Sequence, residues 1–171
     1  VTGMRSPTRA IARLLHANDA YACFDYAASA PYVEIDMNPV PDAEGGDASY
    51  DAVFLSPHKF LGGPGSSGVL VFNERLYSRD LPPSVAGGGT VDYVSPLDQD
   101  FIADIEEREK AGTPGVLQTM KAALAMDLKQ KVGVERIEAR EHELLRRAMQ
   151  QWSANERFEL LGNADPARRI G

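Results

Sequence analysis

The sequence is poor in cysteine, in basic charge and in long apolar runs, and each scarcity excludes a class of protein. Cys23 is the only cysteine, so the chain can form neither an internal disulfide nor a zinc site built from several thiolates. Lys and Arg number 18 against 25 Asp and Glu, which gives a net charge of -7. This acidic balance argues against nucleic acids and anionic membranes as partners, because both require a basic surface.

Long apolar segments are also missing. No run approaches the roughly 20 residues that a membrane-spanning helix needs, and the longest stretches have the length of strands. The first residues predict no signal peptide, since no basic region precedes an apolar one. Together with the single cysteine, this suits a reducing, cytoplasmic compartment. Hydrophobic residues still make up 43% of the 171, a composition typical of a folded protein, and the missing initiator methionine indicates a piece of a longer one.

The first 72 residues alternate between a helical pattern and short apolar runs. An apolar stripe at helical spacing predicts a helix over 5–16. Apolar runs without polar alternation predict strands at 21–24, 52–55 and 69–72, each buried on both faces. Residues 36–51 are rich in Pro, Gly and Asp and predict a long surface loop. Helices that alternate with buried strands indicate a layered α/β fold.

The second half of the chain is predicted to be mainly helical. Beyond the third strand the pattern is irregular, and a long helix is expected after Pro114. Five apolar residues step along one face of this helix: Leu117, Met120, Leu124, Leu128 and Val132. Gly133 interrupts the pattern, and a second helical stretch follows with apolar positions over 137–152. The tail, 158–171, predicts a strand and a turn.

Lys59 is the first candidate for chemistry. It lies at the end of Ser-Pro-His-Lys, which directly follows the second predicted strand. An ammonium at such a place costs desolvation free energy unless it is paired or its pKa falls. A lysine held in that state is a candidate for Schiff-base chemistry, and the alternative is a surface lysine in a loop.

Asp25 is the second candidate, because it ends the first predicted strand. Its carboxylate could cap a turn. It could also face a cation in a cleft at the carboxyl ends of the strands, where open α/β sheets bind ligands. Asp25 and Lys59 together would suit a cofactor that has a cationic ring nitrogen and a reactive aldehyde.

The glycine-rich bridge 62–68 is a weak signal for nucleotide binding. A phosphate loop has its lysine after the last glycine and opens a helix, whereas Lys59 precedes these glycines and a strand follows them. A dinucleotide fingerprint also needs its glycines between a strand and a helix. The bridge is therefore interpreted as a tight turn, and a nucleotide-binding domain stays a minor alternative.

The chain resembles the class V aminotransferases, the fold-type I pyridoxal-phosphate enzymes that include cysteine desulfurases and selenocysteine lyases. The matching stretches are VTGMRSP (1–7), CFDYAASAPYVEIDM (23–37), DAVFLSPHKFLGGPGSSGVLVF (51–72), AGGGT (86–90) and EREKAGTPG (107–115). The resemblance implies an incomplete three-layer α/β/α large domain. Residues 1–110 would be the second half of that domain, and residues 111–171 a linking helix and the beginning of the small C-terminal domain.

The resemblance also implies a role for each site residue. Lys59 would form the Schiff base with pyridoxal 5'-phosphate and move the α-proton of an amino-acid substrate as base and acid. Asp25 would pair with the pyridine nitrogen and keep the ring cationic, so that it withdraws electrons. Ser56 and His58 match positions that contact the cofactor phosphate. Thr113 would reach the phosphate of the neighbouring subunit's cofactor, which implies a homodimer; its alternative role is the N-cap of the helix at Pro114.

The sequence departs from the family at one position of the site. Ala28 stands where the family usually has a glutamine that hydrogen-bonds the phenolic oxygen of the cofactor. The leading hypothesis is a pyridoxal-phosphate enzyme acting on an amino acid, with desulfurase, lyase, transaminase and epimerase outcomes open. The alternative is a non-catalytic α/β assembly module. No metal site is expected: His16 and His142 are interpreted as helix-surface or helix-end residues, and Cys23 as a small core residue.

Overall fold

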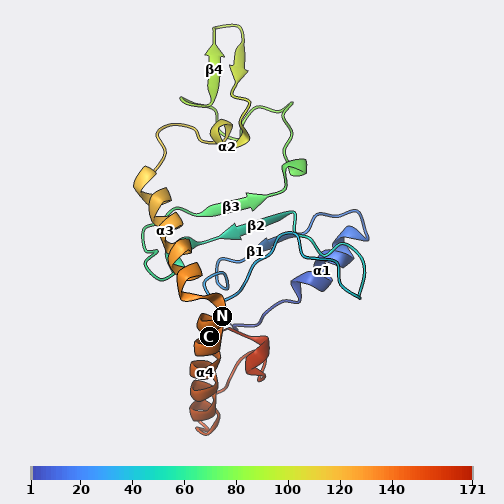
Figure 1. Ribbon diagram of the computed structural model, residues 1–171, viewed down its shortest axis with the longest axis vertical. Coiled ribbons are helices and arrows are strands. Elements are labelled where there is room, and N and C mark those ends of the chain that lie inside the picture. The colour runs from blue at the N-terminus through green and yellow to red at the C-terminus, as the bar shows by residue number, and fades with distance from the viewer. Residues whose placement is uncertain (1, 171) are drawn as a thin grey trace.

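A three-stranded sheet lies at the centre of the structure, a computed structural model that describes residues 2–170 (Figure 1). Its strands are β1 (Cys23–Asp25), β2 (Ala52–Leu55) and β3 (Val69–Phe72), in that order across the sheet. β1 runs parallel to β2, and β3 runs antiparallel to it. The carboxyl ends of β1 and β2 therefore meet at one edge of the sheet.

The structure has three longer helices: α1 (Thr8–His16), α3 (Val116–Val132) and α4 (Val134–Ser153). Gly133 separates α3 from α4 with a φ of 91°, a conformation that glycine adopts without steric cost. The remaining helical elements are short: α2 (Ile105–Arg108), η1 (Pro57–Lys59), η2 (Glu74–Leu76) and η3 (Pro166–Arg168). The predicted α/β class, the three strands and the helix break at Gly133 are confirmed.

The hydrophobic core lies against one face of the sheet. Phe24, Val53 and Leu55 share this face because side chains alternate along a strand. They pack in one cluster with Ala12 of α1 and Ala125 of α3. Both helices therefore bury apolar area against the same sheet face.

The opposite face is open among the described residues. Cys23, Asp25, Phe54 and Leu70 lie on it, and all four are exposed. The prediction that the strands are buried on both faces is thus wrong for residues 2–170, because α1 and α3 reach the core only from the Val53 side. The interpretation of Cys23 as a core residue is wrong for the same reason.

The first three residues of the apolar stripe predicted for α3 also face solvent, whereas Leu128 and Val132 are half-buried. Leu117 and Leu124 are 77% and 65% exposed, whereas Ala122 and Ala125 are buried. The helix has apolar residues on more than one face, and the alanine face is the one that contacts the core. The small alanine side chain allows a close approach of the helix backbone to its neighbours, which helical spacing alone does not reveal.

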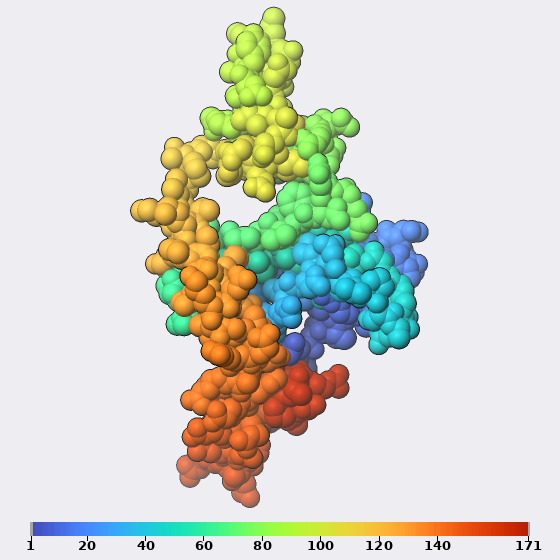
Figure 2. Space-filling model, in the orientation of Figure 1, coloured from blue at the N-terminus to red at the C-terminus, as the bar shows by residue number. Residues whose placement is uncertain are grey.

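A lobe that the sequence pattern did not predict stands apart from the sheet. It contains a hairpin of β4 (Val91–Val94) and β5 (Gln99–Phe101), with α2 at its base (Figure 1). Figure 2 shows open space between this lobe and β3. Arg108 of α2 lies with its guanidinium 5.0 Å from the centre of the Phe101 ring, which joins the helix to the hairpin.

Two further irregular segments pack against the body: the loop 36–51 and the C-terminal tail. Residues 36–51 form an irregular loop, as predicted, and Arg9 of α1 holds it by donating to the carbonyl oxygens of Asp36 and Ala48 at 2.6 and 2.9 Å. The strand predicted at 158–171 is wrong: within the described part of this tail, the β-structure is a single bridge between Met4 and Arg169. No helix among residues 2–170 is long and apolar enough to cross a membrane.

Candidate cofactor site

Asp25 and Lys59 lie at the carboxyl ends of two adjacent parallel strands. Asp25 is the last residue of β1, and Lys59 ends η1, which begins two residues after β2. Pro57 favours the first position of η1 because its φ is fixed and no amide donor is needed there. The Lys59 and Phe60 amides close this short helix by donating to the Ser56 and Pro57 carbonyl oxygens at 3.0 and 2.9 Å.

Lys59 is exposed, and its Nζ makes no hydrogen bond or ion pair with any residue of the described part. Of the two alternatives for this ammonium, a desolvated or a surface environment, the described residues show the surface one. Lys59 lines a hollow of about 360 Å³ between η1 and α3, together with Tyr32, Phe60, Leu128 and Lys129. The amine is thus accessible to a ligand.

Asp25 has one engaged and one available oxygen. Its Oδ1 accepts a hydrogen bond from the Ala27 amide at 2.7 Å, so the turn-capping alternative is confirmed. Within 2–170 no donor reaches Oδ2. Asp25 and Ala28 line a second hollow of about 620 Å³, which also includes Cys23 and Tyr50. The structure therefore brings Asp25 and Lys59 to one sheet edge but not into one hollow.

Ser56 and His58 flank Pro57 at the same edge. Ser56 is half-buried and His58 is exposed, and neither side chain hydrogen-bonds to another described residue. A hydroxyl and an imidazole are therefore available as donors next to Lys59. These are donor types that suit a phosphate group.

Thr113 lies in the exposed segment that leads into α3. Gly115 is the N-cap of α3 and no side chain caps the helix, so the capping role considered for Thr113 is wrong. The amide of Gly112 donates to the Gly88 carbonyl oxygen at 2.8 Å. The glycine loop at 87–89 and the segment around Thr113 therefore contact each other, on the side of the molecule that carries the hairpin lobe (Figure 1).

Lys129 of α3 contacts the segments that follow Asp25 and Lys59, and sequence reasoning missed it. Its Nζ donates to the carbonyl oxygens of Ala30 and Val33, both at 2.6 Å, and lies 5.5 Å from the centre of the Phe60 ring. Burial lowers the pKa of Lys129, and the nearby Glu34 carboxylate partly opposes this effect. No local pattern points to it, because the partners lie 99 and 96 residues away in the sequence.

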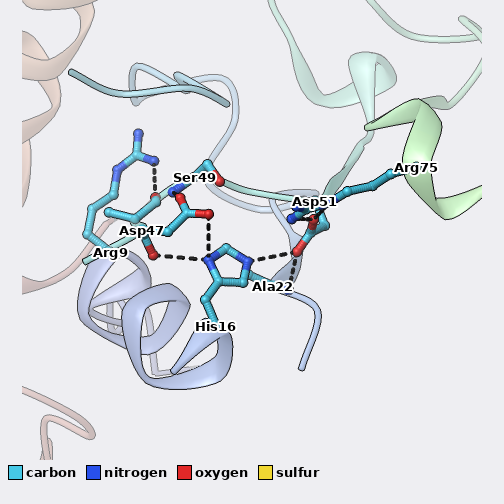
Figure 3. Close-up of polar contacts among 8 residues, drawn as sticks. Arg9, His16, Ala22, Asp47, Ser49, Asp51 and Arg75 are labelled. Carbon is cyan, nitrogen blue, oxygen red and sulfur yellow. Dashed lines mark hydrogen bonds and ion pairs between the residues drawn. The ribbon is translucent and has the colours of Figure 1, made fainter. Parts of the chain in front are cut away.

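A buried carboxylate organises the opposite edge of the sheet (Figure 3). Asp51 is fully buried and accepts hydrogen bonds from the Ala22 amide at 2.7 Å and from Arg75 Nε at 2.8 Å. His16, the last residue of α1, places Nε2 2.9 Å from Asp51 and Nδ1 3.0 Å from the Asp47 carbonyl oxygen. These contacts join α1, the start of β1, the start of β2 and η2.

The titration of this cluster follows from its contacts. The hydrogen bond with Asp51 raises the pKa of His16, against burial, which lowers it; Asp47 raises it further. Burial raises the pKa of Asp51, but its hydrogen bonds to His16, Ala22 and Arg75 outweigh burial and hold the pKa below its usual value. Because donors engage both carboxylate oxygens, we interpret the cluster as structural. His16 is at a helix end, as predicted.

The comparison with known proteins identifies the family. Residues 1–171 match the family described as aminotransferase class-V. The chain therefore belongs to this family, whose members depend on pyridoxal phosphate.

Among residues 2–170, no group of three or more His, Cys, Asp or Glu side chains could hold a metal ion.

The relatives in sequence are named cysteine desulfurases. The chain is 28% identical over 171 residues to a probable cysteine desulfurase of Halalkalibacterium halodurans and 30% identical over 151 residues to one of Streptomyces coelicolor. The two matches cover 100% and 88% of this chain. They cover only 39% and 34% of the length of these curated relatives.

Solved structures share the fold. The apo cysteine desulfurase from Thermococcus onnurineus NA1 matches 98% of this chain and 39% of its own, with a TM-score of 0.82 at 24% identity. The cysteine desulfurase CsdA from Escherichia coli matches 91% of this chain and 36% of its own, with a TM-score of 0.74 at 21% identity. This likeness confirms the predicted fold.

Proposed function

We propose that the protein that carries this chain is a pyridoxal-phosphate enzyme that acts on an amino acid, and that its reaction releases sulfur from cysteine. Family membership and the names of the relatives support this proposal. The observation that carries it is the position of Lys59 and Asp25 at the carboxyl ends of adjacent parallel strands, each with a polar atom that no described residue engages. Residues 1–110 would belong to the large domain, and residues 111–171 to the linking helix and the small domain.

The residues present fit the cofactor. When bound, pyridoxal phosphate supplies an aldehyde for a lysine amine and a ring that withdraws electrons. Lys59 Nζ would be the amine that holds it, and the same nitrogen could then take or give the α-proton of the substrate. Asp25 would accept a hydrogen bond from the ring nitrogen, and the Ser56 hydroxyl and the His58 imidazole would donate to the phosphate. The methyl group of Ala28 offers no donor to the phenolic oxygen.

We further propose a homodimer in which Thr113 contacts the cofactor phosphate of the neighbouring subunit. The exposure of Thr113, whose side chain bonds to no described residue, supports a role between subunits rather than within one chain. The proposed substrate is a free amino acid. A reducing, cytoplasmic compartment remains part of the proposal, supported by the single cysteine.

The test is chemical trapping of the lysine. Borohydride reduction of the purified, cofactor-loaded protein, followed by digestion and mass spectrometry, should find the reduced cofactor on Lys59. Lys59→Ala should remove this adduct, whereas Lys131→Ala, which changes an exposed lysine of α3, should keep it. An adduct that persists in Lys59→Ala, or a wild-type protein without one, would reject the assignment. The alternative, a non-catalytic assembly module, predicts a wild-type protein that carries no reduced cofactor adduct.

The reaction is tested separately with L-cysteine and a thiol reductant. A desulfurase should form alanine and sulfide in equal amounts, because the Cβ–S bond breaks and two reducing equivalents release the sulfur. Formation of a keto acid in place of alanine would assign transamination to the same lysine.

A further inference from the structure

We propose that Lys129 is a positioning residue of the cofactor site. It fastens the segment 26–33, which directly follows Asp25, to Phe60, which directly follows Lys59. This inference rests on the proposed function, because it assigns Lys129 the task of holding the two halves of that site in register.

The first half is held through backbone carbonyl groups. Segment 26–33 forms a helix-like turn in which the Ala30 amide donates to the Tyr26 carbonyl oxygen at 2.8 Å and the Val33 amide to that of Ser29 at 3.2 Å. The carbonyl oxygens at the end of such a turn carry partial negative charge and favour a cation. The Lys129 ammonium donates to two of them, those of Ala30 and Val33. Ala30 and Val33 are buried, at 0% and 5% exposure, and Lys129 is half-buried, so these bonds are partly shielded from water.

The second half is held through an aromatic ring. Phe60 is buried, at 6% exposure, and its ring centre lies 5.5 Å from Lys129 Nζ, within the range of a cation–π contact. The Phe60 amide is bonded to the Pro57 carbonyl oxygen in η1, so the ring moves with the backbone of Lys59. One ammonium therefore contacts both strand-end segments from the same helix.

An ammonium at this place needs a reason, because burial disfavours its charge. Packing alone does not call for lysine at this half-buried position, because an apolar side chain of similar length would fill the same space without the desolvation cost of a charge. The contacts that only lysine makes here are the two bonds to the carbonyl oxygens. Lys131, two residues further along α3, differs: it is exposed and pairs with Asp127 on the helix surface.

The experiment compares four forms of the cofactor-loaded protein: wild type, Lys129→Met, Lys129→Arg and the control Lys131→Met. Methionine keeps the length and the apolar stem of lysine but loses the donors, while arginine keeps donors and charge. The measured quantities are the dissociation constant for pyridoxal phosphate, the pH midpoint of its visible absorbance band, and KM and kcat separately. We expect Lys129→Met to weaken cofactor binding by about tenfold or more, since two charge-assisted bonds are lost, and to shift the pH midpoint. Lys129→Arg should restore part of both, and Lys131→Met should match the wild type.

A second measurement needs no variant and covers the case in which Lys129→Met fails to fold. Hydrogen exchange of the wild-type protein should show that cofactor loading slows exchange in both 26–33 and the part of α3 around Lys129, because the two segments are coupled. Loading that protects neither segment would overturn the inference, as would a folded Lys129→Met with unchanged affinity and pH midpoint. If the wild-type protein takes no cofactor at Lys59, the proposed function itself fails, and the role of Lys129 fails with it.

Discussion

Replacing Asp51 with asparagine should destabilise the sheet far more than its effect on side-chain volume suggests. Asparagine keeps one carbonyl oxygen and puts an NH₂ donor in place of the other. If the oxygen stays with Arg75, the NH₂ group faces the Ala22 amide and His16, so that donor meets donor. The variant thus lacks the carboxylate oxygen that tethers β1, through the Ala22 amide, and α1, through His16.

The magnitude follows from the exposure of each partner. The Arg75 side chain is 49% exposed, so solvent screens its ion pair with Asp51 and the pair contributes little. The Ala22 amide is buried and costs about 1–3 kcal/mol when it has no acceptor. With the loss of the bond to His16 included, we expect the free energy of unfolding to fall by about 2–4 kcal/mol.

The assay is urea unfolding followed by far-UV circular dichroism, on the protein that carries the chain. Asp47→Asn is the matched control, because the Asp47 side chain is 53% exposed although it also lies near His16; its effect should stay within about 0.5 kcal/mol. An Asp51→Asn variant as stable as Asp47→Asn would refute the view that Asp51 joins these elements.

Two further outcomes follow from the structure. The pKa of His16 is raised from 6.5, so its protonated form stabilises the fold fully below pH 6.5, and this contribution is lost as the pH rises through the higher folded-state pKa. His16→Ala should therefore remove part of the decline in unfolding free energy that is measured across neutral pH. An unchanged slope of unfolding free energy against pH would contradict the assignment. Gly63→Ala would put a Cβ 1.8 Å from a backbone oxygen of η1, so it should lower the melting temperature and the cofactor content at Lys59, at a cost of about 2 kcal/mol or more. Gly88→Ala, which meets open space, is its control, and equal melting temperatures for the two variants would show that the backbone of η1 can move.

The order of the elements was predictable because it depends on local pattern. Helical spacing predicted α1 and α4, short apolar runs predicted the three strands, and Gly133 marked the break between α3 and α4. The same reasoning placed Asp25 and Lys59 at strand ends. The hairpin of β4 and β5 was missed because its strands are short and mostly exposed, so they lack the apolar run that marks a buried strand.

The sequence by itself therefore determined the class of fold, the positions of the three central strands and the longer helices, and the two residues on which the proposed chemistry depends. Only the tertiary structure decided which surfaces are buried: Ala125 and not Leu124 on α3, and one sheet face and not the other, which leaves Cys23 exposed. It also decided the long-range polar contacts, of Asp51 with His16 across 35 residues and of Lys129 with Ala30 across 99. Local spacing fixes how a segment folds, but the partner of a buried charge is set by which distant segments the packing brings within a few ångströms.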